Sequence, residues 1–131
     1  MNEPPRTGTE HTLTFLASAE HTIHFEKHDL PPVVSTPALL WFMEHAALQL
    51  LEEYLDEGEL SVGSGIDLEH LAPALEGAEI RCVATVVLAA QRNATFRVKA
   101  FEGETLLSQG LHRRQIVSAD RLRKRLANGN G

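Results

Sequence analysis

The segment STPALLWFMEHAALQLLEEYL, residues 35–55, contains the strongest structural signal in the sequence. Apolar residues recur in it every three or four positions, which is the period of an α-helix. Thr36 is suited to cap the N-terminus of this helix, and Pro37 to occupy its first position, where a missing N–H has no cost. The pattern continues to Asp56-Glu57-Gly58, which gives a helix of about five turns. Its apolar surface is too wide for an ordinary surface helix, so we expect a sheet to wrap around it.

Strands are predicted on both sides of this helix. Alternating apolar and polar residues indicate a strand that begins near Thr9, and Ile23 and Phe25 belong to a short extended piece. After the helix, the chain is extended from Ser61 to Leu71 and then turns. Three long β patterns follow, at residues 78–91, 94–101 and 105–117. A short basic helix, residues 119–126, is predicted after a capping Ser118.

The order of these elements indicates the fold class. The last strands follow one another through hairpin turns without crossover helices, which excludes an α/β fold. A curved antiparallel sheet around one apolar helix buries both elements, which makes the domain α+β. The length, residues 1–131, fits a single domain. Within it we expect residues 1–8 to be a loose arm and residues 127–131 to be a disordered tail.

Composition narrows the class of protein and its partners. The net charge of −6 argues against a nucleic-acid partner, because nucleic acids bind basic surfaces. Cys82 is the only cysteine, so we expect no intramolecular disulfide and no multi-cysteine metal site. The histidines lack a convincing metal spacing with carboxylates, so no other metal site is expected. The sequence has no secretory signal and no apolar run of the ~20 residues that cross a bilayer. We therefore expect a cytoplasmic protein without membrane contact.

Glu44 is the first candidate for chemistry, because it interrupts the apolar helix. A carboxylate that is partly buried there is unfavourable unless it is paired or used. The alternative is that Glu44 lies on a solvent-exposed stripe with Trp41 and Leu48. Those neighbours are apolar, which favours the functional interpretation.

His70 and Thr36 are the next candidates. Alternation along the strand places His70 on the same face as Ile66 and Leu68, which are expected to meet the core. A histidine in such a place can be structural or functional. Thr36 can act as a helix cap, and it also marks a helix N-terminus whose free N–H groups can hold an oxyanion.

A wider pattern of residues resembles the hotdog-fold thioesterases related to fluoroacetyl-CoA thioesterase. It consists of residues 35–46, Tyr54-Leu55-x-x-Gly58-Glu59, Ser61-Val62-Gly63-x-Gly65-Ile66-x-x-x-His70, Leu75-x-Gly77 and Gly110-x-His112-x-Arg114. That family uses a threonine at the helix start, a glutamate eight residues on, a histidine on the next strand and a glycine seven residues before the histidine. The residues at these four positions are Thr36, Glu44, His70 and Gly63.

The resemblance implies a hotdog fold and hydrolysis of a small acyl-CoA thioester. Thr36, Glu44 and His70 are then catalytic, with the roles of nucleophile and base left open. Coenzyme A belongs to the substrate, and no separate cofactor is expected. We expect the substrate to bind at Leu30, Gly63, Ser64 and Gly65, since the glycines allow close approach to the backbone. Leu30 stands where the fluoroacetyl-specific enzyme has an aromatic lid residue, so fluoroacetyl specificity is not expected.

Other functions and other residues are less favoured. A hotdog-fold enoyl-CoA hydratase needs an Asp/His pair, for which His28-Asp29 is a poor match, and a non-catalytic acyl-CoA-binding domain would not need Thr36, Glu44 and His70 together. Cys82 lies on an apolar face and is expected to be a buried small hydrophobe. Arg113, Arg114 and the basic run 121–125 can either meet the phosphates of coenzyme A or form a solvated face, and we favour the second.

Helix geometry predicts at least a homodimer. Thr36 and Glu44 are about 12 Å apart along one helix at about 1.5 Å per residue. A thioester carbonyl reacts within roughly 3–3.5 Å of its catalytic groups, so one straight helix cannot bring both residues to it. Two-fold pairing would bring the helix start of one chain toward the glutamate of the other and would cover an open sheet edge. The alternative is a loop that folds Thr36 back over its own helix.

Overall fold

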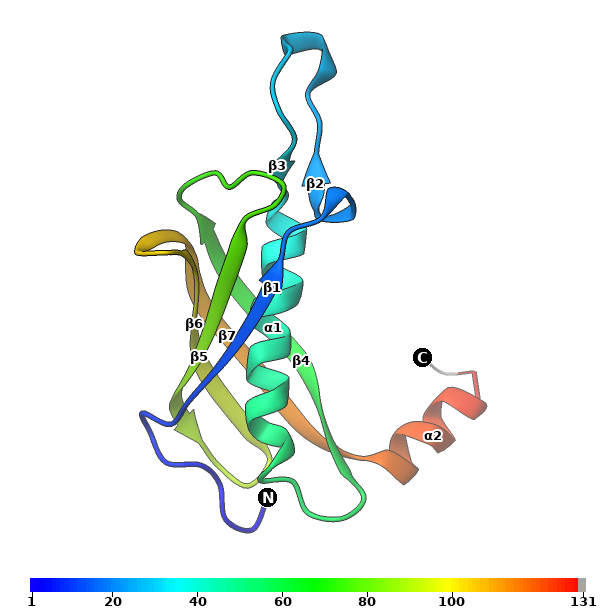
Figure 1. Cartoon of the computed structure of the whole chain (residues 1–131). Coiled ribbons are helices and arrows are strands. Elements are labelled where there is room, and N and C mark those ends of the chain that lie inside the picture. The colour runs from blue at the N-terminus through cyan, green and yellow to red at the C-terminus, as the bar shows by residue number, and fades with distance from the viewer. Residues whose placement is uncertain (130–131) are drawn as a thin grey trace.

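A curved five-stranded antiparallel sheet wraps around one long helix, α1 (Figure 1). The computed structural model describes residues 1–129. The main sheet has the strand order β1-β5-β6-β7-β4, and β2 and β3 form a separate small ladder. The elements are β1 Glu10–Leu16, η1 Ala19–His21, β2 Thr22–Ile23, η2 Glu26–His28, β3 Val33–Val34, α1 Thr36–Glu52, β4 Glu59–His70, β5 Glu79–Ala89, β6 Asn93–Glu102, β7 Thr105–Ser118 and α2 Ala119–Ala127. The α+β class and the wrapped helix predicted from the sequence are confirmed.

The ends of α1 differ from the prediction. Ser35, not Thr36, caps the helix, because its side chain accepts a hydrogen bond of 3.3 Å from the backbone N–H of Ala38. Thr36 is the first helical residue, so its hydroxyl is free for another partner. The helix also ends at Glu52, earlier than the apolar pattern suggests. Gly58, with a φ of +80°, belongs to the turn that leads into β4, a backbone conformation that glycine adopts without strain.

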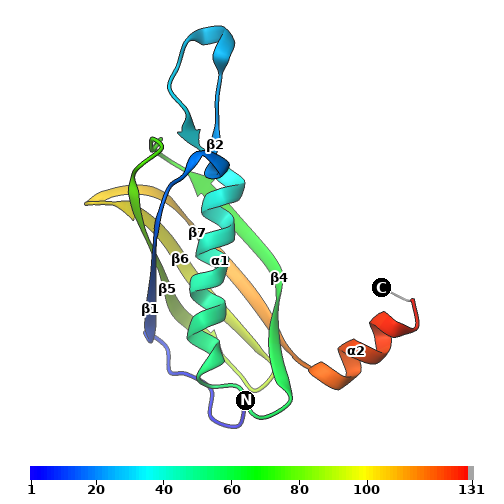
Figure 2. The same ribbon diagram turned by 45° about the vertical axis from the view of Figure 1, so that its right-hand side comes forward.

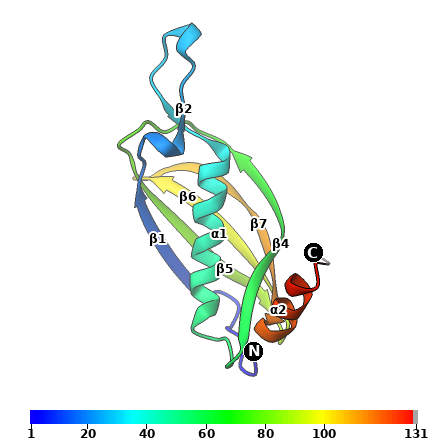
Figure 3. The ribbon, with the colours of Figure 1, turned by 90° about the vertical axis from the view of Figure 1, so that its right-hand side faces the viewer.

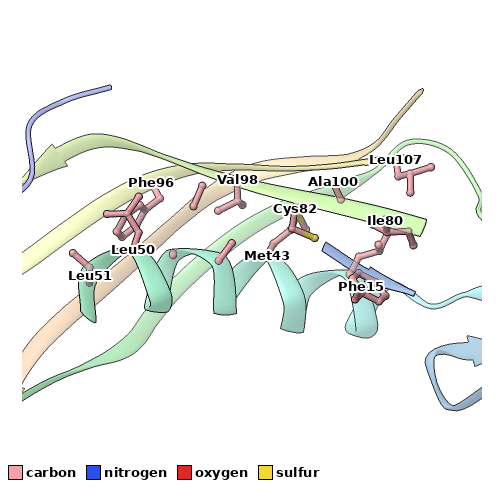
Figure 4. Close-up of a cluster of buried hydrophobic side chains, with 14 of the residues drawn as sticks. Phe15, Met43, Leu50, Leu51, Ile80, Cys82, Phe96, Val98, Ala100 and Leu107 are labelled. Atoms are coloured by element: carbon pink, nitrogen blue, oxygen red, sulfur yellow. The ribbon is translucent and has the colours of Figure 1, made fainter. Parts of the chain in front are cut away.

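The core fills the space between α1 and the concave face of the sheet (Figure 4). Met43 of α1 lies near Cys82, and Leu51, two turns further along, lies near Phe96 (Figure 4). All four are fully buried. Burial raises the pKa of the Cys82 thiol to about 12, so it stays protonated and is a poor nucleophile. This agrees with the expectation that Cys82 is a small buried hydrophobe.

The N-terminal segment is packed against the body, contrary to the loose arm expected for residues 1–8. The Met1 side chain is 2% exposed and belongs to the core. Its ammonium group lies 3.0 Å from Oε1 of Glu59 and donates to the carbonyl of Gln91 at 2.9 Å. Further along, the N–H of Gly8 donates to the carbonyl of Val86. The expectation failed because polar composition does not reveal a buried first residue.

Two segments extend away from the body (Figures 1 and 2). Residues 22–34 project beyond the N-terminal end of α1, and α2 projects from the other end of the sheet. Ser118 caps α2, as predicted, by accepting from the N–H of Arg121. The helix includes Ala127, where the tail was expected to begin, and residues 130–131 of that tail lie outside the described residues. No helix within residues 1–129 is long and apolar enough to cross a membrane.

Candidate active site

Thr36 and His70 form a hydrogen-bonded pair at the N-terminal end of α1. Oγ1 of Thr36 lies 2.7 Å from Nδ1 of His70, which is the last residue of β4. Both residues are exposed in the single chain. The structure therefore places a hydroxyl, an imidazole and the positive end of a helix dipole at one accessible point. This is an arrangement that can activate a hydroxyl and attract a negatively charged oxygen.

Glu44 lies further along α1, in a separate cluster of polar side chains on the inner face of the sheet. Its Oε2 is 3.8 Å from Nη1 of Arg114 and 3.9 Å from Nε2 of His112. The Glu44 side chain is 31% exposed, whereas His112 and Arg114 are fully buried. The expectation of a partly buried and paired carboxylate on the helix is thus met, with Arg114 as the partner.

Gly63 leaves the space that the Glu44 carboxylate occupies. A Cβ atom added at Gly63 would overlap Oε2 of Glu44 and would lie 3.4 Å from Cε1 of His112. Any side chain at this position must therefore displace the carboxylate. In this structure the space beside Gly63 is filled by a side chain of the protein itself.

A β-bulge brings Gly63 and His70 to the same face of β4. The two residues are seven positions apart, so a regular strand would point them to opposite faces. The register of β4 against β7 shifts between Gly63 and Gly65, and one extra residue restores the common direction. Both Glu44 and the Thr36–His70 pair depend on this bulge.

Ser64 and Gly65 complete the bulge of β4. The contacts of Gly65 are with Arg113 and His112, not with Thr36, Glu44 or His70. A Cβ at Gly65 would overlap the exposed guanidinium of Arg113, on the outer face of the sheet. The carbonyl of Gly65 accepts a hydrogen bond of 2.9 Å from Nδ1 of His112. Substrate binding by Ser64 and Gly65 stays a prediction.

Arg113 and Arg114 do not form one basic surface, as their adjacency suggested. Alternation along β7 places Arg113 on the outer face and Arg114 on the inner face. Arg114 is 3% exposed and donates from Nε to Oγ of Ser61 and from Nη2 to its carbonyl. Burial lowers the pKa of Arg114, and Glu44 opposes this effect. Arg114 is therefore not part of a solvated face.

His112 and Ser61 were named in the sequence only as part of the family pattern, and Arg114 was expected on a solvated face; none was selected as a candidate site residue. A usable signal was present, because the alternation of β7 places His112 and Arg114 on the same face as the apolar Ile116. Two polar groups among inward residues need partners. Only the packing of α1 over β4 and β7 shows that Glu44 is near them.

Leu30 and the pair His28-Asp29 lie on the projecting segment 22–34. Leu30 is 50% exposed, and Phe25 on the same segment is 47% exposed. His28 and Asp29 are also exposed, at the end of η2, and no hydrogen bond joins either of them to Thr36, Glu44 or His70 in the described residues. The geometry therefore gives no support to a hydratase site built on them.

The Thr36–His70 pair and the polar cluster around Glu44 lie apart within one chain. Thr36 and Glu44 are separated by two turns of α1, which is about 12 Å. A shallow hollow of about 240 Å³ lies beside His70, lined by Val33, Val34, Leu71, Ala72 and Pro73. A larger hollow, of about 690 Å³, is lined by residues of α2, the start of β4 and the end of β7, and by none of the three catalytic candidates. Figure 3 shows α2 at the end of the sheet opposite the N-terminal end of α1. Among residues 1–129, no group of three or more acidic, histidine or cysteine side chains could hold a metal ion.

Comparison with known proteins shows related sequences and structures of the same fold. The fluoroacetyl-CoA thioesterase of Streptantibioticus cattleyicolor is 25% identical over 127 residues, which cover 92% of this chain and 91% of that protein. A thioesterase superfamily member from Thermus thermophilus is 28% identical with a TM-score of 0.87, covering 98% of this chain and 94% of its own. A hot-dog-like protein from Thermanaerovibrio acidaminovorans is 30% identical with a TM-score of 0.84, and the match covers 95% of this chain and 93% of that protein.

The family comparison covers the fold and every candidate catalytic residue. The model of the fluoroacetyl-CoA-specific thioesterase family, FlK, matches residues 17–120, from the end of β1 to the start of α2. This range contains Thr36, Glu44 and His70 as well as the Arg114 cluster. The chain adopts the hotdog fold and belongs to the FlK family of acyl-CoA thioesterases.

Proposed function

We propose that this thioesterase hydrolyses a small acyl-CoA thioester with Thr36, His70 and Glu44 as its catalytic residues. The observation that carries the assignment is the 2.7 Å contact between Thr36 and His70 at a helix N-terminus. The substrate acyl-CoA brings its own coenzyme A, and the chemistry of these residues needs no further cofactor. Coenzyme A thioesters are metabolites of the cell interior, so we place the enzyme in the cytoplasm.

The geometry supports separate roles for the two clusters. Thr36 can donate its hydroxyl proton to Nδ1 of His70 as the hydroxyl oxygen attacks the thioester carbonyl. The C–S bond then breaks, His70 gives the proton to the departing thiolate of coenzyme A, and the acyl group remains as an ester on Thr36. The positive end of the α1 dipole favours the oxygen that becomes negative in this step. Glu44, 3.8 Å from the Arg114 guanidinium, then suits a general base that takes a proton from the water that attacks this ester. The Thr36 oxygen leaves and takes up that proton, which releases the free acid.

We further propose that each complete site contains residues of two chains. Within one chain, Thr36 and Glu44 are too far apart to touch one reacting carbon, and the hollow beside His70 is smaller than the ~300 Å³ at which small-molecule pockets begin. A second copy can bring its Glu44 to the Thr36–His70 pair of the first. The alternative of a Thr36 loop folded back over the helix is not favoured, since Thr36 is itself the first residue of α1.

Two uncovered surfaces fit a second copy of this chain. The strand order leaves β4 at an edge of the sheet, with one side unpaired among the described residues. On α1, Trp41 is 51% exposed and stacks on His45 at 3.6 Å, on the side of the helix that the sheet does not cover. An exposed tryptophan and an open strand edge are each typical of an interface between subunits. A homodimer formed over both surfaces would bury them.

The substrate preference is expected to differ from that of the fluoroacetyl-specific enzyme. Leu30, on the projecting segment, cannot reproduce the shape and polar edge of an aromatic gate. We expect kcat/KM for fluoroacetyl-CoA and acetyl-CoA to differ by about tenfold or less. Release of the free thiol from each substrate measures both values. A preference of several orders of magnitude for the fluorinated substrate would contradict this prediction.

Substitution of the catalytic residues is the direct test of the proposed function. We expect Glu44→Gln and His70→Ala each to lower kcat by about 100-fold or more, because each removes a proton-transfer group, while the fold is kept. Steady-state kinetics on short acyl-CoA thioesters and a thermal melt measure the two effects. Glu52→Gln at the end of α1 and His28→Ala on the projecting segment are matched controls with expected wild-type kinetics. A folded Glu44→Gln enzyme with wild-type turnover would exclude this mechanism. A non-catalytic acyl-CoA-binding role would instead require that the folded wild-type protein binds acyl-CoA and releases no free thiol.

The bulge glycines provide a second test with a built-in control. Gly63→Ala forces the Glu44 carboxylate to move, and the moving atoms are the end of a flexible side chain, so the fold is expected to survive. We expect kcat to fall by about tenfold or more, because the carboxylate is displaced. Gly65→Ala, two residues along in the same bulge, displaces the exposed Arg113 guanidinium and not the Glu44 carboxylate, so kcat should stay within about twofold. Because Gly65 is a predicted substrate-binding residue, any effect of this variant is expected in KM. Equal activity in the two variants would contradict the assigned role of Gly63.

A further inference from the structure

His112 is fully buried, and both of its ring nitrogens have partners. It lies on β7 opposite Ile66 of β4, and its side chain is 1% exposed. Nδ1 is 2.9 Å from the carbonyl oxygen of Gly65, and Nε2 is 3.1 Å from Nη1 of Arg114. These two contacts join the bulge of β4 to the cluster around Glu44.

The two partners determine the protonation of the ring. A carbonyl oxygen only accepts, so Nδ1 of His112 carries the proton, and a guanidinium only donates, so Nε2 carries a lone pair. The ring is therefore neutral. Burial lowers the pKa of His112, and the adjacent Arg114 lowers it further, against the opposing effect of the hydrogen bond to Gly65. His112 is thus an acceptor for Arg114 and not a cation paired with Glu44, although Nε2 is only 3.9 Å from the carboxylate.

This acceptor fixes one end of the Arg114 guanidinium. Ser61 accepts from Nε and Nη2 at 2.9 and 3.0 Å, and His112 accepts from Nη1. Nη1 has two hydrogens, and after one is given to His112 the other remains for the Glu44 carboxylate, 3.8 Å away. Without His112, Glu44 would be the only remaining partner of Nη1 among the residues Ser61, His112 and Glu44 that surround the guanidinium.

We propose that His112 is a positioning residue of this thioesterase, which as a neutral acceptor holds Arg114 in the orientation that places the Glu44 carboxylate. The inference rests on the proposed role of Glu44. His112 does not touch the substrate, and its effect reaches the reaction through Arg114. A displacement of about 1 Å at a reacting group can change a rate by about 100-fold, so such support has a measurable effect.

Two isosteric substitutions separate the positioning role from simple packing. A glutamine at 112 can place its Oε1 near the position of Nε2 and accept from Arg114, whereas an asparagine can place its amide N–H near Nδ1 and donate only to Gly65. We expect His112→Gln to keep kcat within about threefold. We expect His112→Asn to lower kcat by about tenfold or more with KM changed by about twofold or less, since the lost interaction acts on the chemical step.

Controls distinguish the failure of this inference from the failure of the proposed function. His11→Asn removes another inward histidine contact, the 2.8 Å hydrogen bond to Gln49 of α1, and should keep wild-type kinetics. Thermal melts of both His112 variants should agree. The positioning role would be overturned by any of three results: wild-type kcat in His112→Asn, an equal loss of kcat in the two His112 variants, or loss of the fold in both. When one of these results is found and Glu44→Gln is inactive in the same assay, only the positioning role of His112 fails. When Glu44→Gln is active, the proposed function itself fails first.

Discussion

The Glu44 carboxylate and the Arg114 guanidinium form the interaction on which the site depends. A carboxylate on the inner side of an apolar helix is unfavourable without a compensating charge, and a buried guanidinium is equally unfavourable alone. The two groups compensate one another across the interface between α1 and the sheet, at 3.8 Å. Gly63 supplies the room for the carboxylate, and Ser61 and His112 hold the guanidinium. The polar cluster can exist only where helix and sheet meet in this register.

The sequence predicted the fold well, because the apolar periods of the helix and strands are strong. It placed the capping residue and the helix end less well. Ser35 and Thr36 are both suited to cap a helix, and only the hydrogen bond to Ala38 distinguishes them. Tyr54 and Leu55 continue the apolar pattern beyond the last helical residue, Glu52, because they pack against the core from the turn. Periodicity records burial, and burial does not require helix.

The candidate site was predictable in its members and not in its arrangement. Thr36, Glu44 and His70 stand out in the sequence by type and spacing, but the contact between Thr36 and His70 depends on a bulge in β4 that no alternation pattern shows. His112 and Arg114 were visible only as inward positions of a strand, and their link to Glu44 depends on tertiary packing. The division of the site into two clusters follows from helix length alone.

The central claim is that the Thr36–His70 pair of one chain works with Glu44 of another. Mixing two inactive variants, Thr36→Ala and Glu44→Gln, after partial unfolding and reassembly measures this directly. In a shared-site dimer each mixed pair contains one site with both substitutions and one intact site, so free-thiol release from acyl-CoA should return to about a quarter of the wild-type rate at equal mixing. Each variant treated alone should remain inactive. Two results would contradict the shared site. One is that activity does not return in mixtures shown to contain heterodimers. The other is that light scattering at assay concentration shows the fully active wild-type enzyme to be a monomer.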